Sequence, residues 1–462
     1  MEAGKRLTYR SAIAVVSLSV ALASCVAPMS ARHQSQPLTL ELTRLPDRQI
    51  AAAYRVAKPI QALHFPSELG GYRAEAWRPE GNDFRWVNEG DGERVERADG
   101  QPFTALTFVI PIDYRELPKS YAPFSPFSEG STLIHSGQFH ACLAAPCKDP
   151  EPLPIAVEAK GATIGVEGRR TLTRDKFVSQ DDGTSIFVGT LEPIEADGFI
   201  AVIDPGLPPN LRQNLDRSLP RAMAYFASFY GPLSFTPELY VSIDDEPEKN
   251  GKISTQGGTL PNQVFMHFDG ENARERLATE DPLWLEWFFA HEAAHLFQQD
   301  KAGGKAGENV AAWIHEGGAD AMAAQAMAKR GTSERSYAQT RLEKAQTACA
   351  QGLATSPLNR ATAEGNFDLH YHCGLIVWLA LDHDMRRNGN ADAGLHDLNR
   401  AFFTAVRAGQ PWNEAVFLQT AGQEGASGSL LTHITRLNDV RYATSAVEEL
   451  GQLAKMSLQS DE

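Results

Sequence analysis

Hydrophobic and polar positions alternate in the first part of the chain, which predicts β-strands. Leu38, Leu40 and Leu42 are separated by polar residues, the two-residue period of a strand with one buried face. Asp91-Gly92 lies between two such segments and indicates a hairpin turn. Short strands separated by glycine and proline turns are typical of a β-sandwich. We predict strands at 38–43, 84–87, 94–96, 104–112 and 199–204, and therefore a β-rich domain over residues 38–206.

Beyond residue 207 the hydrophobic period becomes helical. Asp281 and Pro282 have the residue types of an N-cap and a first helical position, and glycine follows several of the predicted helices. Two or three further helices are expected in residues 394–462. The pattern predicts helices at 211–230, 282–299, 310–330, 334–351 and 369–387, with strands at 238–243 and 264–268. The fold class is α+β, with domains at 38–206 and 207–390 and a helical region at 391–462.

The N-terminus has the features of a targeting segment. Basic residues precede an apolar stretch, residues 12–23, that is too short to span a bilayer. It ends in Leu22-Ala23-Ser24-Cys25, which looks like a bacterial lipobox with Cys25 as the lipidated residue. Residues 1–24 would then be the signal peptide and 25–37 a tether, and Val26 implies an outer-membrane lipoprotein facing the periplasm. Ordinary secretory cleavage is the alternative.

Cysteine usage fits the periplasm, which is an oxidising compartment. Of five cysteines, removing Cys25 leaves Cys142, Cys147, Cys349 and Cys373. An even number favours disulfides, and the sequence leaves three connectivities open. The turn-forming Ala145-Pro146 favours the Cys142–Cys147 pair, which leaves Cys349–Cys373 as the second. Buried free thiols are the alternative.

Composition narrows the possible partners. The 462 residues carry a net charge of −15, with 42% hydrophobic and 22% charged residues. Such a chain is globular and large enough for several domains. Because phosphate binding requires a basic surface, the acidic balance argues against nucleic acid as a partner.

The strongest chemical signal is the H-E-x-x-H pattern at residues 291–295. A helix places His291 and His295 on one face, where both imidazoles can bind one metal ion, and Glu292 lies beside them as a candidate general base. A zinc site needs a third protein ligand. Glu316 follows His295 after 20 intervening residues (296–315), enough for a turn and an antiparallel helix.

Two features of the second helix support this interpretation. Asp320 lies one turn after Glu316 and could accept the outer N–H of a ligand imidazole. Gly317 and Gly318 would each cost about 1 kcal/mol inside a helix, which is explicable if another backbone approaches closely. The alternative makes both acids surface residues of an alanine-rich helix.

H-E-x-x-H followed by Trp313-Ile314-His315-Glu316-Gly317-Gly318-Ala319 resembles the gluzincin metallopeptidases, in particular the aminopeptidase-N-like enzymes and the PDZ-bearing glycyl aminopeptidases. The resemblance covers residues 207–385 and implies a thermolysin-like catalytic domain that hydrolyses peptides with Zn²⁺. It implies that His291, His295 and Glu316 are the zinc ligands and Glu292 the general base. Tyr371-His372-Cys373-Gly374 matches the family's Y-x-x-G pattern, which implies that Tyr371 stabilises the oxyanion.

The sequence departs from this family at the substrate-binding strand. The aminopeptidases have a G-x-M-E-N motif whose glutamate binds the substrate's amino group. Here Gly258-Thr259-Leu260-Pro261-Asn262 occupies that place, with Pro261 at the glutamate position. We expect Gly257 and Gly258 to line the cleft, but strict aminopeptidase activity is in doubt. The nearby acids Asp244, Asp245, Glu246 and Glu248 are candidate substitutes, although a solvated loop is the favoured interpretation.

Three interpretations of function follow. The favoured one is a zinc metallopeptidase acting on a peptide or protein and held at a membrane by its lipid anchor. The second is a catalytically inactive gluzincin-like binding or assembly lipoprotein. The third is a zinc hydrolase of a non-peptide substrate. His315, His370 and His372 flank the proposed site and could contact substrate, although each is more often a packed or surface histidine.

Overall fold

The computed structural model of the protein describes residues 38–66, 71–88, 90, 92–117, 120–196, 198–245, 253–307, 311–388, 394–439 and 444–459. The predicted signal peptide, Cys25 and the tether lie outside the described residues. Residues 38–462 form one compact unit. Among the helices that the structure describes, none is both long and apolar enough to cross a membrane.

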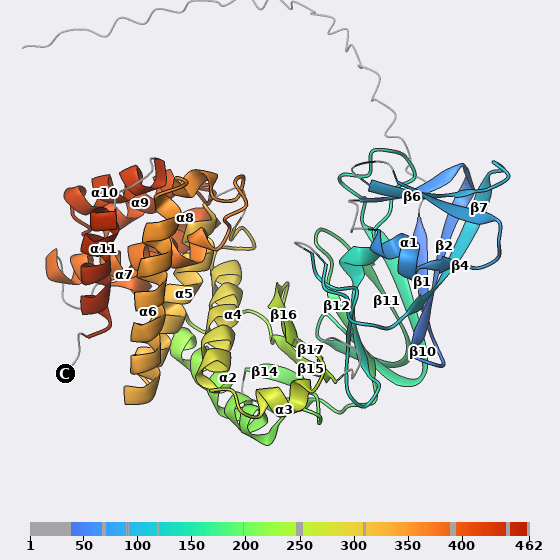
Figure 1. The fold of residues 1–462 in the computed structure, drawn as a ribbon, viewed down its shortest axis with the longest axis horizontal. Helices are drawn as coiled ribbons and strands as arrows, with labels where there is room; N and C mark the ends of the chain where they lie inside the picture. The colour runs from blue at the N-terminus through green and yellow to red at the C-terminus, as the bar shows by residue number, and fades with distance from the viewer. Residues whose placement is uncertain are drawn as a thin grey trace, which may run out of the picture. The chain divides into compact units, whose positions relative to one another are not determined.

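The first part of the unit is a β region of two packed sheets (Figure 1). The larger sheet has the order β4-β7-β2-β1-β10-β12-β9-β8, with β11 also paired to β10; its strands are β1 (Thr39–Leu45), β2 (Gln49–Ile60), β4 (Arg78–Pro79), β7 (Phe103–Pro111), β8 (Phe124–Pro126), β9 (Thr132–His135), β10 (Leu153–Val166), β11 (Arg169–Ser179) and β12 (Ser185–Gly189). The smaller sheet, β3-β6-β5, consists of β3 (Ala62–Pro66), β6 (Gly92–Arg97) and β5 (Phe84–Asn88).

Aromatic side chains join these two sheets. Phe65 and Trp86 of the small sheet lie 6.1 and 5.4 Å from Phe108 of β7, measured between ring centroids. Trp77, which follows the short helix α1 (Tyr72–Ala76), completes the cluster. The strands β1, β5, β6 and β7 form where alternation and the hairpin turn predicted them, so the sandwich-like N-terminal region is confirmed.

The second sheet system has the order β13-β14-β15-β17-β16, built from β13 (Ile194–Ala196), β14 (Phe199–Ile203), β15 (Glu238–Asp244), β17 (Gln263–Gly270) and β16 (Ile253–Leu260). The pairs β14–β15 and β15–β17 are parallel, while β16 is an antiparallel edge strand. Alternate residues of these strands face opposite layers. Val241 and Met266 pack with the helices, whereas Tyr240 and Phe265 pack with Phe187 and neighbours of the β region.

Sheet membership changes ahead of the boundary predicted between residues 206 and 207. Residues 199–204 were grouped with the N-terminal strands, but β14 pairs in parallel with β15 and belongs to the second sheet. Alternation identifies a strand without identifying its partner, which is why the sequence misplaced this one.

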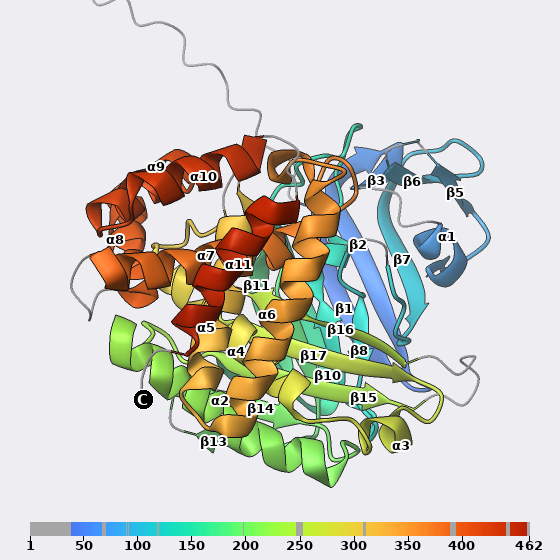
Figure 2. The ribbon, with the colours of Figure 1, turned by 60° about the vertical axis from the view of Figure 1, so that its left-hand side comes forward.

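Helices follow and cover one face of this sheet (Figures 1 and 2). They are α2 (Pro209–Tyr230), α3 (Ala273–Leu277), α4 (Leu283–Lys301), α5 (Ala312–Ala328), α6 (Thr332–Leu353), α7 (Leu369–Asn388), α8 (Leu395–Arg407), α9 (Glu414–Gln423), α10 (Gly428–Asp439) and α11 (Thr444–Ser457). The five long helices predicted between residues 211 and 387 are α2 and α4–α7, and α11 lies along α6 and α7. The described C-terminal region has four helices, more than the two or three expected, because α9 and α10 are short and separated by a glycine turn at Gly425.

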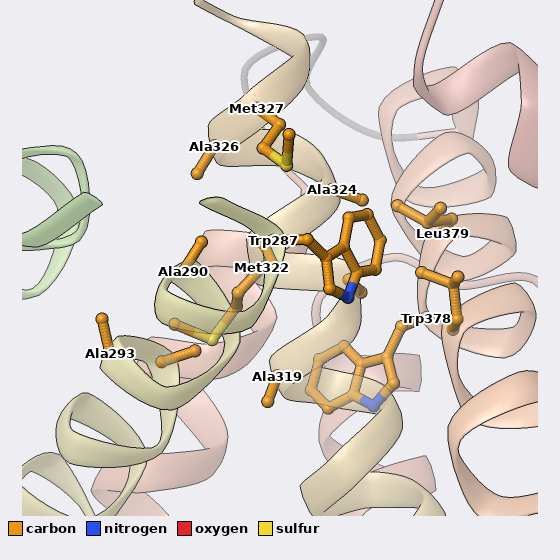
Figure 3. Close-up of a cluster of buried hydrophobic side chains, with 14 of the residues drawn as sticks. Trp287, Ala290, Ala293, Ala319, Met322, Ala324, Ala326, Met327, Trp378 and Leu379 are labelled. Carbon is orange, nitrogen blue, oxygen red and sulfur yellow. The ribbon is translucent and has the colours of Figure 1, made fainter. Parts of the chain in front are cut away.

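The α4 and α5 helices are buried almost all round and rich in alanine. Figure 3 shows Ala290 and Ala293 of α4 in one cluster with Ala319 and Met322 of α5 and Trp378 of α7. Small side chains allow helix axes to approach closely, so the backbones that carry the H-E-x-x-H motif and Glu316 are held together by packing.

Both favoured disulfides are present. Cys142 bonds to Cys147 with Cα atoms 5.5 Å apart, and Cys349 bonds to Cys373 with Cα atoms 5.0 Å apart. The second bond joins α6 to α7 two residues after Tyr371. It therefore anchors the first turn of the helix that carries the proposed oxyanion-binding tyrosine.

Candidate metal centre

The α4 helix brings the two histidines of the motif together. Their Nε2 atoms lie 2.9 Å apart, and both side chains are buried. The helix begins at Leu283, one residue later than predicted, and Pro282 is its N-cap, with its carbonyl accepting the Glu286 amide at 3.1 Å. Asp281 still accepts a hydrogen bond from the Leu283 amide at 3.0 Å. The helix start is therefore fixed, and with it the direction in which the imidazoles point.

The third predicted ligand comes from α5. Glu316 Oε2 lies 3.2 Å from His295 Nε2 and 3.4 Å from His291 Nε2. Gly317 and Gly318 follow Glu316, and the sequence predicts that another backbone approaches them closely. A methyl group on Gly317 would lie 2.3 Å from the Cα of Gly374 in α7, so α5 and α7 touch through their backbones.

These three atoms suit a divalent metal ion. They converge on one point, with separations of 2.9–3.4 Å between them. A tetrahedral zinc ion with ligand bonds of about 2.0–2.2 Å requires ligand atoms roughly 3.3–3.6 Å apart, close to this spacing. Two nitrogens and one carboxylate oxygen also form the donor set that zinc takes in hydrolases, with a fourth position open.

Both imidazoles are oriented through their outer nitrogens. His291 Nδ1 lies 2.9 Å from Asp320 Oδ1, and Trp287 Nε1 donates to the same oxygen at 2.9 Å. His295 Nδ1 lies 2.8 Å from Gln298 Oε1. These contacts leave the two Nε2 atoms facing the centre. Asp320 is where the sequence predicted it, whereas Gln298 was missed, although its position one turn after His295 on the same helix was a usable signal.

The protonation of His291 and Glu316 depends on the opposite charges next to them. Burial disfavours charge on His291, but the Asp320 carboxylate raises the pKa of His291 well above its ordinary value. Burial also opposes charge on Glu316, yet the charge and hydrogen bonds of His295 and His291 hold the pKa of Glu316 well below the usual range. The carboxylate is therefore ionised and available as a ligand.

The proposed base and the proposed oxyanion donor flank this centre. Glu292 Oε2 accepts a hydrogen bond from the Thr259 hydroxyl of β16 at 2.5 Å. The Tyr371 ring stacks on His291 with centroids 5.8 Å apart. Burial, and then the neighbouring Glu316 carboxylate, raise the pKa of Tyr371 far above its ordinary value, so its hydroxyl stays protonated and can donate a hydrogen bond.

The edge strand β16 places Gly257 and Gly258 next to Thr259, and so beside the base. Pro261 lies in the turn that joins β16 to β17 and offers no carboxylate.

Of the acids suggested as substitutes, Asp244 is buried at the end of β15, whereas Asp245 is exposed and follows the strand, as the solvated-loop interpretation expects. Asp244 is 6% exposed and pairs with Arg48 at 2.5 Å, and Asp245 accepts the Ala273 amide. Both are used in the fold. Glu246 and Glu248 lie outside the described residues.

The three flanking histidines differ in their surroundings. His315 stacks on His295 with centroids 4.2 Å apart, and burial lowers the pKa of His315 to about 4. His370 Nε2 is hydrogen-bonded to the Thr362 hydroxyl at 2.9 Å, and burial lowers its pKa. Burial lowers the pKa of His372 as well, although its side chain is partly exposed. Only His315 packs directly on a residue of the centre among these three.

Comparisons with known proteins establish the fold. No protein-family model and no curated protein sequence matches the chain. Among solved structures, an aminopeptidase N family protein from Idiomarina loihiensis is similar over 90% of this chain and 78% of its own, with a TM-score of 0.64 and 11% identity. Yeast LTA4 hydrolase is similar over 84% of this chain and 64% of its own, with a TM-score of 0.50 and 12% identity.

An M1 zinc metallopeptidase from Deinococcus radiodurans is also similar, over 88% of this chain and 93% of its own, with a TM-score of 0.46 and 16% identity. The likeness to the Idiomarina protein and to yeast LTA4 hydrolase, at 11% and 12% identity, shows the fold. The chain has an M1-like gluzincin fold, as its motifs implied, with a β-rich N-terminal region, a central region of sheet and helices and a helical C-terminal part.

Proposed function

We propose that the protein is a zinc-dependent metallopeptidase. The observation that carries this proposal is the convergence of His291, His295 and Glu316 on one point beside Glu292. Zinc held there would polarise a peptide carbonyl and lower the pKa of water toward about 7.

The surrounding residues have matching roles. Glu292 takes the proton of the attacking water and passes it to the leaving amine. The Thr259 hydroxyl holds the Glu292 carboxylate on the side of the edge strand, where an extended peptide backbone would pair. The Tyr371 hydroxyl donates a hydrogen bond to the carbonyl oxygen as negative charge develops on it.

The proposed location rests on the N-terminal sequence. Cys25 is the lipidated residue, and the chain faces the periplasm from the outer membrane. Metabolic labelling with a fatty acid tests this, because a Cys25→Ala variant should lose the label and the membrane association. A variant that retains both would contradict the anchor without affecting the site.

The decisive experiment combines metal analysis with peptide hydrolysis by the purified full-length protein. We expect one zinc per chain and cleavage of a mixed peptide library that stops with a chelator and returns with zinc. Glu292→Gln should keep the zinc while turnover falls by at least about 10²–10⁴-fold, the usual contribution of a general base. Glu343→Gln, at a carboxylate 61% exposed on α6, serves as the control and should change neither quantity.

Other outcomes separate the alternatives. Zinc without cleavage of any peptide or other ester or amide would favour a binding lipoprotein, and cleavage of non-peptide substrates alone would favour a different hydrolase. Comparing peptides with free and blocked N-termini tests the consequence of Pro261. Because no carboxylate occupies that position, we expect blocking to reduce kcat/KM less than it does in an enzyme with an amine anchor.

A further inference from the structure

The β region contributes a side chain that packs against the edge strand. Gly258 of β16 has no side chain, and the space is filled by Tyr121. A methyl group on Gly258 would lie 2.6 Å from the Tyr121 hydroxyl oxygen and 3.1 Å from its Cε1. Burial, followed by the charges of Glu292 and Glu316, raises the pKa of Tyr121, which agrees with its position near the metal centre.

The opposite face of the same strand is covered as well. Neighbouring residues of a strand point to opposite faces. Gly257 faces Phe288 of α4, whose Cζ would lie 2.4 Å from a methyl group there. Aromatic rings therefore bound the edge strand on both faces directly before Thr259. Its outer edge is left as the approach for a peptide backbone.

Tyr121 is held firmly in this position. Gln256 of β16 accepts the Ala122 amide at 2.7 Å and donates to the Ser120 carbonyl at 3.2 Å, so it binds both neighbours of Tyr121. Gln138 donates to the Tyr121 carbonyl at 2.7 Å. The ring also packs edge-on against Phe265 of β17, with centroids 5.0 Å apart. These hydrogen bonds fix the backbone around Tyr121, and Phe265 supports its ring beside Gly258.

We propose that Tyr121 is a specificity-determining residue that restricts one substrate position next to the scissile bond to small side chains such as those of glycine, alanine and serine. This inference rests on the proposed peptidase function. A substrate residue paired with Gly258 would direct its side chain to the Gly258 face, where Tyr121 lies. That substrate residue would be the neighbour, along the peptide, of the residue paired with Thr259. The Thr259 hydroxyl is hydrogen-bonded to the proposed base Glu292.

The test is a peptide panel in which the residues on either side of the scissile bond are varied from alanine to leucine and phenylalanine. We expect the wild-type protein to favour alanine at one of these positions by at least about tenfold in kcat/KM, since a methylene group that does or does not fit is worth roughly 10–200-fold. Tyr121→Ala should remove that preference by raising kcat/KM for the large side chains. Tyr121→Phe should keep it, because the ring remains.

Controls separate this role from a structural one. Phe84→Ala removes an aromatic ring of the same region that packs against Phe103, and it should leave the ratio between peptides unchanged. Tyr121→Leu retains an apolar contact with Phe265, so it serves if the alanine variant loses its fold or its zinc. A change of equal factor for all peptides, or a wild-type protein without a size preference, overturns the inference and leaves the peptidase function standing. A wild-type protein that cleaves no peptide overturns both.

Discussion

The β region and the helical region each bury a group of opposite charges, and the two groups are built differently. In the β region, Arg73 and Glu93 are 1% and 3% exposed and pair at 3.1 Å, with the guanidinium also bonded to the Gln138 carbonyl. In the helical region, the partners of Glu316 are the imidazoles of His291 and His295.

The difference explains what each cluster can do. A guanidinium is always protonated and occupies the space of the cation it supplies. An imidazole can give up its proton and present a lone pair to a metal ion instead. The arginine pair therefore fixes a fold, whereas the histidine cluster converges on a point that an external cation can occupy. Substitutions in the two groups should therefore affect different properties. A change in the β region should lower the free energy of unfolding, and a change in the helical region should abolish metal binding and hydrolysis.

The largest expected effect is at the metal centre. Glu316→Gln removes the anionic ligand, so we expect bound zinc and peptide hydrolysis to fall below detection while the fold is retained. Metal analysis and circular dichroism of the purified variant measure both. Normal zinc content in this variant would show that Glu316 is not a ligand.

The corresponding change in the β region should affect stability alone. Glu93→Gln leaves Arg73 buried without its carboxylate, and breaking such a pair typically costs about 3–5 kcal/mol of unfolding free energy. Zinc per folded chain should not change. Glu75→Gln, at a carboxylate 62% exposed that pairs with Arg115, is the control for a surface pair and should have little effect. Equal losses of unfolding free energy in Glu93→Gln and Glu75→Gln would contradict the structural role of the buried pair.

A smaller effect is expected from Tyr371→Phe. The variant loses one hydrogen-bond donor to the developing oxyanion, which typically costs about 2.7–4 kcal/mol, or 10²–10³-fold in kcat. Zinc content and KM should be nearly unchanged, because the ring still stacks on His291. A kcat close to wild type would remove Tyr371 from the mechanism.

The last prediction is a pH dependence of stability that is shared by both regions. Burial lowers the pKa of His135 and of His396 to about 3, compared with an ordinary value of 6.5. The unfolded chain therefore binds more protons between these values, and stability is lost as the pH falls through that window, by at most roughly 1.4 kcal/mol per pH unit for each histidine. Denaturant unfolding at pH 7 and pH 5 measures the change.

A matched pair of variants isolates the histidine contribution from that of the carboxylates. His135→Asn should reduce the difference between the two pH values, whereas His383→Asn, at a partly exposed side chain, should not. If both variants show the wild-type difference, His135 does not titrate as its burial implies.

The sequence predicted best where the partners lie on neighbouring helices. The spacing of His291, His295 and Glu316 follows from helical geometry and a single helix–turn–helix connection, and the glycine pair indicated that another backbone approaches closely, which proves to be that of α7. Alternation likewise identified the N-terminal strands. These signals are local, so they can be recognised in the sequence without knowledge of the tertiary fold.

The sequence was least informative where a contact joins segments that lie far apart along the chain. Thr259 is 33 residues from Glu292, and Tyr121 reaches Gly258 from the other sheet system. No periodicity encodes such a pairing, because it depends on how the sheets pack. The same reason accounts for β14, whose pattern is that of a strand but whose neighbour is set by a parallel crossover through α2.

The crossing of Gly317 and Gly374 has a consequence for redesign. With backbone against backbone, the segment bearing Glu316 and the segment bearing Tyr371 behave as one rigid part, and neither can be shifted without shifting the other. Attempts to retune metal affinity through α5 will therefore also alter the rate of turnover. Independent adjustment is better sought on the β-region side of the edge strand, where Tyr121 comes from the segment between β7 and β8.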